Sequence, residues 1–222
     1  MVQDFANSLA RTRKQMTKQE VRQLIEALRE EHPNAVCELN FNSTFELLVA
    51  VILSAQCTDK RVNVVIEKLF KKYNTPAQFA TMDIQELEKM IYSCGFYHNK
   101  AKNIISCAKD IVDRFDGVVP NEIDQLVTLA GVGRKTANVV YAVGFGGQAI
   151  AVDTHVLRVS NRLGLASSTN PLVVEKSLMK VIPKENWSEF HHLLIHHGRY
   201  TCSSQRPKCD ECKIQKYCNY IK

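Results

Sequence analysis

The stretch LAGVGRKT, residues 129–136, is the part of the sequence that decides the fold. It joins two short patterns, residues 123–127 and 134–145, whose apolar positions recur with the spacing of a helix. Between them, Gly131 and Gly133 permit a positive φ and let backbone N–H groups approach a ligand without interference from a Cβ atom. Two helical patterns joined by such a turn predict a helical hairpin.

The second helix of this hairpin is predicted to begin with two basic residues, Arg134 and Lys135. A helix N-terminus exposes N–H groups and a positive partial charge, so it favours an anion and normally carries acidic side chains. A phosphate of DNA would compensate the unusual placement of two cations. We therefore predict that contacts to DNA come from Gly131, Val132, Gly133 and Arg134.

Lys135 allows two interpretations. Beside Arg134 and the positive end of a helix, its amine is placed to act as a nucleophile that forms a Schiff base with an aldehydic sugar carbon. Alternatively, it contacts phosphate and has no covalent role. The local sequence leaves both open.

The rest of the chain predicts an all-α fold of roughly ten helices. Residues 45–53, FELLVAVIL, are apolar nearly all round, which is typical of a central buried helix. A capping box at Thr17–Glu20 begins one of several amphipathic helices. Only residues 149–152 have the character of a strand, and they are few. The low content of turn formers, with 9 Gly and 6 Pro, argues against a turn-rich all-β chain.

Composition excludes several classes of protein. Of the 222 residues, 45% are hydrophobic and 23% charged, which predicts a packed globular core. No apolar run approaches the length of a membrane span, and no secretory signal is expected near Met1. We therefore expect a cytoplasmic protein, associated with the nucleoid if the host is bacterial. The net charge of +6 is by itself weak evidence for a nucleic-acid partner.

Eight cysteines divide into two groups. Four crowd into the C-terminal segment with only one CxxC pair, a compact spacing that favours an iron–sulfur cluster over zinc. These predicted ligands are Cys202, Cys209, Cys212 and Cys218. The other four lie among apolar neighbours and are expected to be buried small hydrophobes. They are Cys37, Cys57, Cys94 and Cys107.

Asp153 follows the extended apolar segment 149–152 and precedes a helical pattern. A carboxylate in this position is a normal N-cap. Held at the mouth of an apolar cleft, it would also stabilise a developing oxocarbenium ion or steer a proton, and the two roles are compatible. The crowded histidines near the C-terminus are distributed around a helix axis, which favours packing and surface roles. They are His191, His192, His196 and His197.

Taken together, these motifs resemble the endonuclease III family of helix-hairpin-helix DNA glycosylases. The matching stretches cover nearly the full chain in order: LSAQCTD, CGFYHNKAKNI, GVGRKTANVV, VDTHVLRVSNRLG, HHGRYTC and the four-cysteine spacing. The resemblance implies two helical domains flanking a DNA cleft. It also implies a [4Fe–4S] cluster and duplex DNA with damaged pyrimidines or abasic sites as the substrate of a monomeric enzyme.

The resemblance also implies roles for single residues. Lys135 would attack C1′ of a flipped nucleotide, Asp153 would assist departure of the base, and the Schiff base would collapse by β-elimination. Gln56 matches the residue that fills the vacated space, and Phe96 matches an apolar wedge. Two departures stand out: Ala130 replaces the usual proline of the hairpin, and an aliphatic residue is familiar where Phe96 stands.

The implied domains are not continuous in sequence. Residues 17–38 with 149–222 would form the cluster-bearing domain, and residues 39–148 a six-helix bundle with the hairpin at about 123–145. Residues 1–16 would be a basic arm.

Two other functions remain open. One is a monofunctional glycosylase for adenine or thymine mismatches, which generally lacks the lysine. The other is a non-catalytic, cluster-bearing DNA-binding protein. Lys135 together with Asp153 favours the bifunctional glycosylase and lyase.

Overall fold

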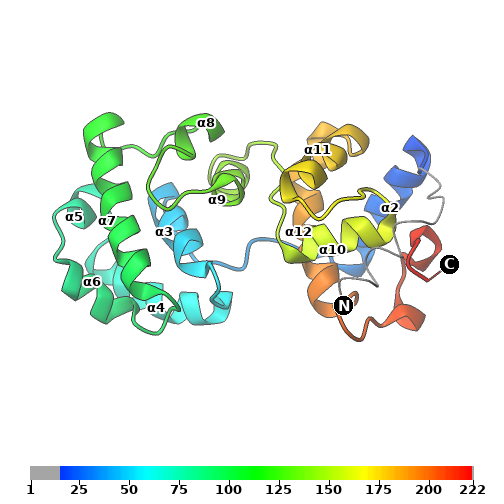
Figure 1. Cartoon of the computed structure of the whole chain (residues 1–222), viewed down its shortest axis with the longest axis horizontal. Helices are drawn as coiled ribbons and strands as arrows, with labels where there is room; N and C mark the ends of the chain where they lie inside the picture. The colour runs from blue at the N-terminus through cyan, green and yellow to red at the C-terminus, as the bar shows by residue number, and fades with distance from the viewer. Residues whose placement is uncertain (1–15, 222) are drawn as a thin grey trace. The chain divides into compact units, whose positions relative to one another are not determined.

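The computed structural model describes residues 16–221, and within them the secondary structure is entirely helical (Figure 1). The predicted all-α class is confirmed. Residues 149–152 belong to no helix and form no strand. The expected basic arm lies, except for Met16, outside the described residues. None of the described helices is long and apolar enough to cross a membrane.

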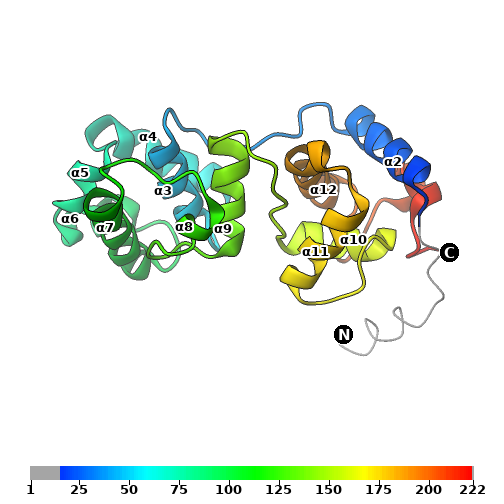
Figure 2. The ribbon, with the colours of Figure 1, turned by 90° about the horizontal axis from the view of Figure 1, so that it is seen from above.

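The chain divides into two compact units. We call Cys37–Ala149 the bundle unit, and Met1–Val36 together with Ile150–Lys222 the cysteine unit. Figure 2 shows the helices of each unit from a second side. The bundle unit contains α3 (Thr44–Ser54), α4 (Asp59–Lys72), α5 (Pro76–Ala80), α6 (Ile84–Ile91), α7 (Tyr97–Arg114), α8 (Ile123–Leu126), α9 (Arg134–Val139) and the π-helix η1 (Val140–Gly144).

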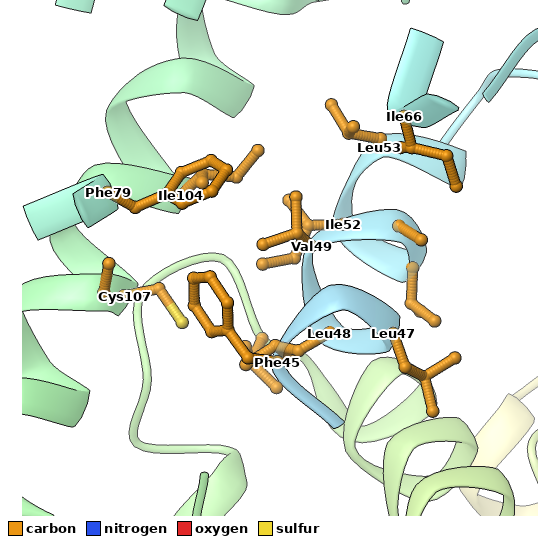
Figure 3. Packing of buried hydrophobic residues seen from close by; sticks show 14 of the residues in the cluster. Phe45, Leu47, Leu48, Val49, Ile52, Leu53, Ile66, Phe79, Ile104 and Cys107 are labelled. Atoms are coloured by element: carbon orange, nitrogen blue, oxygen red, sulfur yellow. The ribbon is translucent and has the colours of Figure 1, made fainter. Parts of the chain in front are cut away.

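Helix α3 forms the centre of the bundle unit. Every residue from Phe45 to Leu53 is buried, as its all-round apolar sequence predicts. Its side chains pack against α4, α5 and α7 (Figure 3). Phe79 of α5 contacts Phe45 of α3 edge to face, with ring centroids 5.3 Å apart. Ser43 caps the helix by accepting a hydrogen bond from Glu46 N–H. Because residues Phe45 to Leu53 are buried, their side chains are not accessible to a ligand. Functional residues of this unit are therefore expected in the exposed turns around α3.

The predicted helix over residues 134–145 is only partly regular. Its first part, α9, is α-helical, and the chain then widens into η1. Gly144, at the end of η1, packs so closely on α3 that a Cβ atom there would lie 2.9 Å from Thr44 Cγ2. We attribute no function to the π turn.

The cysteine unit is built from segments at both ends of the chain. It contains α2 (Lys18–Glu31), α10 (Thr154–Leu163), α11 (Pro171–Val181), η2 (Lys184–Asn186), α12 (Trp187–Tyr200), η3 (Cys209–Glu211) and η4 (Gln215–Tyr217). The capping box at Thr17 is present. Buried side chains of α2, α10, α11 and α12 share one core, onto which Ile214 and Tyr217 of the C-terminal segment pack.

The cysteines predicted to be buried bystanders behave differently from one another. Cys94 and Cys107 are buried, as expected, but Cys37 and Cys57 are only half-buried. The expectation of burial is therefore wrong for this second pair.

Candidate active site and cysteine loop

The predicted hairpin is formed by α8, a turn and α9. Gly131 has φ +75°, and a Cβ atom there would lie 2.8 Å from Cβ of Asn103 on α7, so both its conformation and its surroundings require glycine. Gly133 has an ordinary φ of −84°. A Cβ atom at Gly133 would meet nothing within 4 Å, so this residue leaves open space at the start of α9.

The other hairpin residues differ in what they present. Arg134 and Lys135 are exposed in the first turn of α9, which begins without a side-chain cap. Val132 is placed differently: its side chain is buried, and its N–H donates to the carbonyl of Leu129 at 3.1 Å. It packs the turn onto the core of the unit. The side chains of Arg134 and Lys135, by contrast, are exposed.

Asp153 is the N-cap of α10, as the sequence predicts. Its Oδ1 accepts hydrogen bonds from the N–H groups of His155 and Val156, each at 2.8 Å. Since both bonds use one oxygen, the cap fixes the carboxylate and leaves Oδ2 for other partners. The residue is half-buried. Beside it, burial lowers the pKa of His155.

Gln56 and Phe96 are both exposed and both left-handed. Their φ angles are +52° and +58°. Such angles are uncommon for residues other than glycine and cluster at functional sites. The only other described non-glycine residue with a positive φ is Asp116, in the turn after α7. Gln56 and Phe96, the two residues predicted to enter DNA, thus share a positive φ that nothing in the neighbouring sequence predicts.

The four C-terminal cysteines line one small cavity in the cysteine unit. Arg162 of α10 holds the loop that carries the first of them, donating to the carbonyls of Ser203 and Ser204 at 2.7 and 3.0 Å. The same guanidinium lies 3.1 Å from Sγ of Cys202. Burial is the largest single effect and raises the pKa of Cys202. The hydrogen bonds and positive charges of His197 and Arg162 together outweigh it, so the pKa of Cys202 lies below its usual value.

The spacing of the sulfurs bears on which metal they fit. Across residues 16–221, only Glu31, His32 and His197 bring three potential ligand atoms within 4.8 Å of one another. No three of the cysteine sulfurs lie so close, whereas tetrahedral zinc with bonds of about 2.3 Å needs sulfurs about 3.8 Å apart. A wider set around a cavity fits a larger group such as a four-iron cube.

His197, expected from the sequence to have a packing or surface role, makes polar contacts within the cysteine unit. It is buried, its Nε2 lies 3.8 Å from Sγ of Cys212, and its Nδ1 lies 3.3 Å from a carboxylate oxygen of Glu31. Thr201 donates to the same oxygen of Glu31 at 2.7 Å. For His197 the expectation of a packing role was therefore incomplete, because its polar partner lies on α2, far away in sequence.

Comparison with known proteins identifies the group to which this architecture belongs. Residues 49–184 match the model of the HhH-GPD superfamily of base excision DNA repair proteins. Endonuclease III of Bacillus subtilis is 53% identical over 187 residues, which cover 84% of this chain and 85% of that protein. Endonuclease III of Escherichia coli is 44% identical over 92% of this chain and 97% of its own length. The chain belongs to the endonuclease III family.

The solved structures agree with this assignment. A trapped covalent complex of an endonuclease III with DNA superposes with a TM-score of 0.88 at 49% identity, covering 93% of this chain and 97% of that one. A thermostable thymine-DNA glycosylase, at 21% identity and a TM-score of 0.81, shares the fold alone. As an endonuclease III family member, the protein is an enzyme of base-excision DNA repair, with DNA glycosylase and abasic-site lyase activities.

Proposed function

We propose that this protein removes oxidised pyrimidines from duplex DNA and then cuts the strand, using Lys135 as nucleophile and Asp153 as its partner. The observation that carries the proposal is the exposed amine of Lys135 in the first turn of α9, next to the open space at Gly133. A backbone without a Cβ at that point allows a phosphate to approach while the amine reaches the sugar.

Lys135 would couple departure of the base to formation of a covalent intermediate. The Nζ lone pair of Lys135 forms a bond to C1′ as the bond from C1′ to the base breaks, and the departing base takes up a proton. The nitrogen loses one proton, the bond from C1′ to the ring oxygen breaks, and that oxygen takes up a proton, which leaves a protonated Schiff base. Removal of a proton from C2′ then breaks the bond from C3′ to the 3′ phosphate, which cuts the strand. Asp153 stabilises the cationic sugar and shuttles these protons.

We further propose a [4Fe–4S] cluster at Cys202, Cys209, Cys212 and Cys218 that is structural. The cavity and the wide spacing of the sulfurs support this group. When bound, the cluster joins η3 and η4 to the core of the cysteine unit. Broad absorbance near 400 nm with about four irons per chain is expected, and a zinc-only protein after anaerobic purification would contradict it.

DNA contacts would come from the hairpin, with Gly131, Gly133 and Arg134 at the phosphates and Val132 supporting the turn. Gln56 and Phe96 would occupy the space left by the flipped nucleotide. Since one chain supplies all of these residues, we propose that it acts as a monomer, at the nucleoid if the host is bacterial.

Borohydride trapping tests the nucleophile. On a duplex containing thymine glycol, the wild-type protein should form a covalent adduct, and Lys135→Ala should form none. Lys68→Ala, which removes another exposed lysine on α4, is the matched control and should trap normally. A wild-type protein that releases the base without forming an adduct would instead identify a monofunctional glycosylase.

Asp153→Asn separates the two roles of the carboxylate. Asparagine caps helices about as well as aspartate, so stability should change by less than about 0.5 kcal/mol. Base excision should fall by at least about 100-fold if the charge is needed at the transition state. Near-normal excision by this variant would reduce Asp153 to a structural cap.

A further inference from the structure

Lys100 is a buried charged side chain to which the mechanism above gives no role. It lies in the first part of α7 and is only 5% exposed. Burying an ammonium group is costly unless hydrogen bonds replace the lost water. A lysine in this environment therefore needs specific partners.

Its partners are the carbonyls at the end of α3. Nζ donates to the carbonyl of Leu53 at 2.8 Å and to that of Ala55 at 2.7 Å. The last turn of α3 contains no basic residue of its own. Because the C-terminal end of a helix carries free carbonyls and a negative partial charge, Lys100 supplies the cation that α3 lacks.

The two bonds fix the chain just before Gln56. Ala55 is the C-cap of α3, and Gln56 follows it directly with its positive φ. A left-handed conformation costs about 1–2 kcal/mol for a residue other than glycine, so it persists only where neighbours impose it. Immobilising the peptide that enters Gln56 is one way to impose it.

The same lysine is anchored to Phe96. The N–H of Lys100 donates to the carbonyl of Phe96 at 3.1 Å, which makes this the first turn of α7. On the other side, a Cβ atom at Gly95 would lie 3.4 Å from the carbonyl oxygen of Gln56, so the two turns touch. Lys100 thus contacts both turns: its side chain holds Ala55, the residue before Gln56, and its backbone N–H binds the carbonyl of Phe96.

A purely local role is less consistent with these contacts. Helix α7 has its own hydrophobic face, with Ala101, Ile104 and Ala108 buried, and does not need a buried cation to pack. Neighbouring Cys94 and Cys57 partly offset the desolvation that lowers the pKa of Lys100. Burial of this charged group costs free energy, and each of the two turns that it contacts carries an exposed side chain predicted to enter DNA.

We infer that Lys100 is a positioning residue, which holds Gln56 and Phe96 in the arrangement that keeps a flipped nucleotide out of the duplex. The inference rests on the proposed function. Lys100 does not touch the substrate: it fixes the backbone of the two residues that would replace the missing base. Its loss should therefore slow the extrusion of a paired base and leave the chemistry at Lys135 intact.

Lys100→Met tests this, because methionine keeps most of the side-chain volume and removes the donors. We expect excision of thymine glycol from a fully paired duplex to fall by about 10- to 100-fold. Unstacking the nucleotide costs a few kcal/mol, and without Lys100 the side chains of Gln56 and Phe96 would no longer offset that cost. Trapping at a preformed abasic site should fall by less than about threefold, and placing the lesion in an unpaired bubble should restore excision.

Coupling to Gln56 gives a second readout. In a double-mutant cycle, the variant with both Lys100→Met and Gln56→Ala should excise the paired lesion no more slowly than the slower single variant. Both substitutions remove the same contribution, the filling of the vacated space by Gln56. Ile104→Ala, one turn further along α7, is the matched control for lost stability. It should lower the melting temperature and leave the ratio of excision to trapping unchanged.

The outcomes separate the two proposals. Wild-type protein without activity on thymine glycol would overturn the proposed function. Active wild type with a Lys100→Met variant that slows both reactions equally, as Ile104→Ala does, would overturn the positioning role. If Lys100→Met does not fold, Lys100→Gln, which retains an N–H donor pair for the carbonyls, should show a smaller defect that is again confined to the paired substrate.

Discussion

In the bundle unit, Gln56, Phe96 and Lys135 lie on turns and a helix end around a core that is complete in itself. The C-terminal segment of the cysteine unit is different: beyond Thr201 it has only the three-residue turns η3 and η4, and its cysteines face a cavity. One unit holds its functional residues by backbone conformation on a finished core. For the other, we propose that a group bound at the cysteines completes the packing of this C-terminal segment.

This difference predicts that loss of the cluster acts on one unit. Structural metal sites contribute on the order of 10 kcal/mol, as much as the whole stability of a typical domain. Cys212→Ser should abolish the absorbance near 400 nm and the hydrogen-exchange protection of α10 and α12, while α3 stays protected. Cys37→Ser, outside the cysteine loop, should change neither.

Loss of protection in α3 as well would break the comparison, because the bundle unit would then depend on the cluster. Full protection of α10 and α12 in Cys212→Ser would instead show that the cysteine unit does not depend on the cluster. In that case the four helices of the cysteine unit would be stable without the loop.

The two glycines of the hairpin sharpen the comparison within the bundle unit. Gly131→Ala should destabilise this unit by about 1–3 kcal/mol, since alanine is strained at φ +75° and its Cβ would collide with Asn103. Gly133→Ala should leave stability within about 0.5 kcal/mol. Because it places a methyl group where a phosphate would approach, we expect it to weaken DNA binding instead.

Urea unfolding and DNA titration measure the two effects separately. Equal losses of stability in both variants would show that the hairpin needs glycine twice for its own folding. Unchanged DNA binding in Gly133→Ala would show that the open space at the start of α9 is not used by the ligand.

The sequence predicted those features that are encoded locally. Asp153 precedes a helical pattern, so its capping role follows from position alone, and the cysteine spacing marks the loop without any knowledge of the fold. The buried helix α3 follows from a stretch of nine residues in which only Glu46 is not apolar. In each case the residues that determine the feature are neighbours in the chain.

The features that were missed depend on distant partners. Lys100 meets the carbonyls of Leu53 and Ala55, 47 and 45 residues earlier, and His197 meets Glu31 of α2. The left-handed φ of Gln56 is imposed by such contacts, since glutamine has no local preference for it. Even Gly133 was misread in one respect: its φ is ordinary, and what it provides is space.

The smallest predicted effect is on the stability that an ion pair between α2 and α12 gives to the cysteine unit, independently of the cysteine loop. Arg29 of α2 donates from Nε and Nη2 to the two oxygens of Glu189 on α12, at 2.7 and 2.6 Å. These bonds outweigh partial burial and lower the pKa of Glu189. A lowered folded pKa stabilises the native state above the ordinary value near 4.5 and loses that contribution as the pH falls through the lowered pKa.

Glu189→Gln should therefore reduce stability at pH 7 by no more than about 1 kcal/mol, because more than a third of each side chain is exposed and solvent screens the pair. The difference from wild type should shrink as the pH is lowered below 4.5 and as salt is raised. Hydrogen exchange in α2 measures it, with Glu67→Gln, from a surface pair on α4, as control. A loss well above 1 kcal/mol would mean that direct contact between α2 and α12, rather than the cysteine loop, holds this unit together.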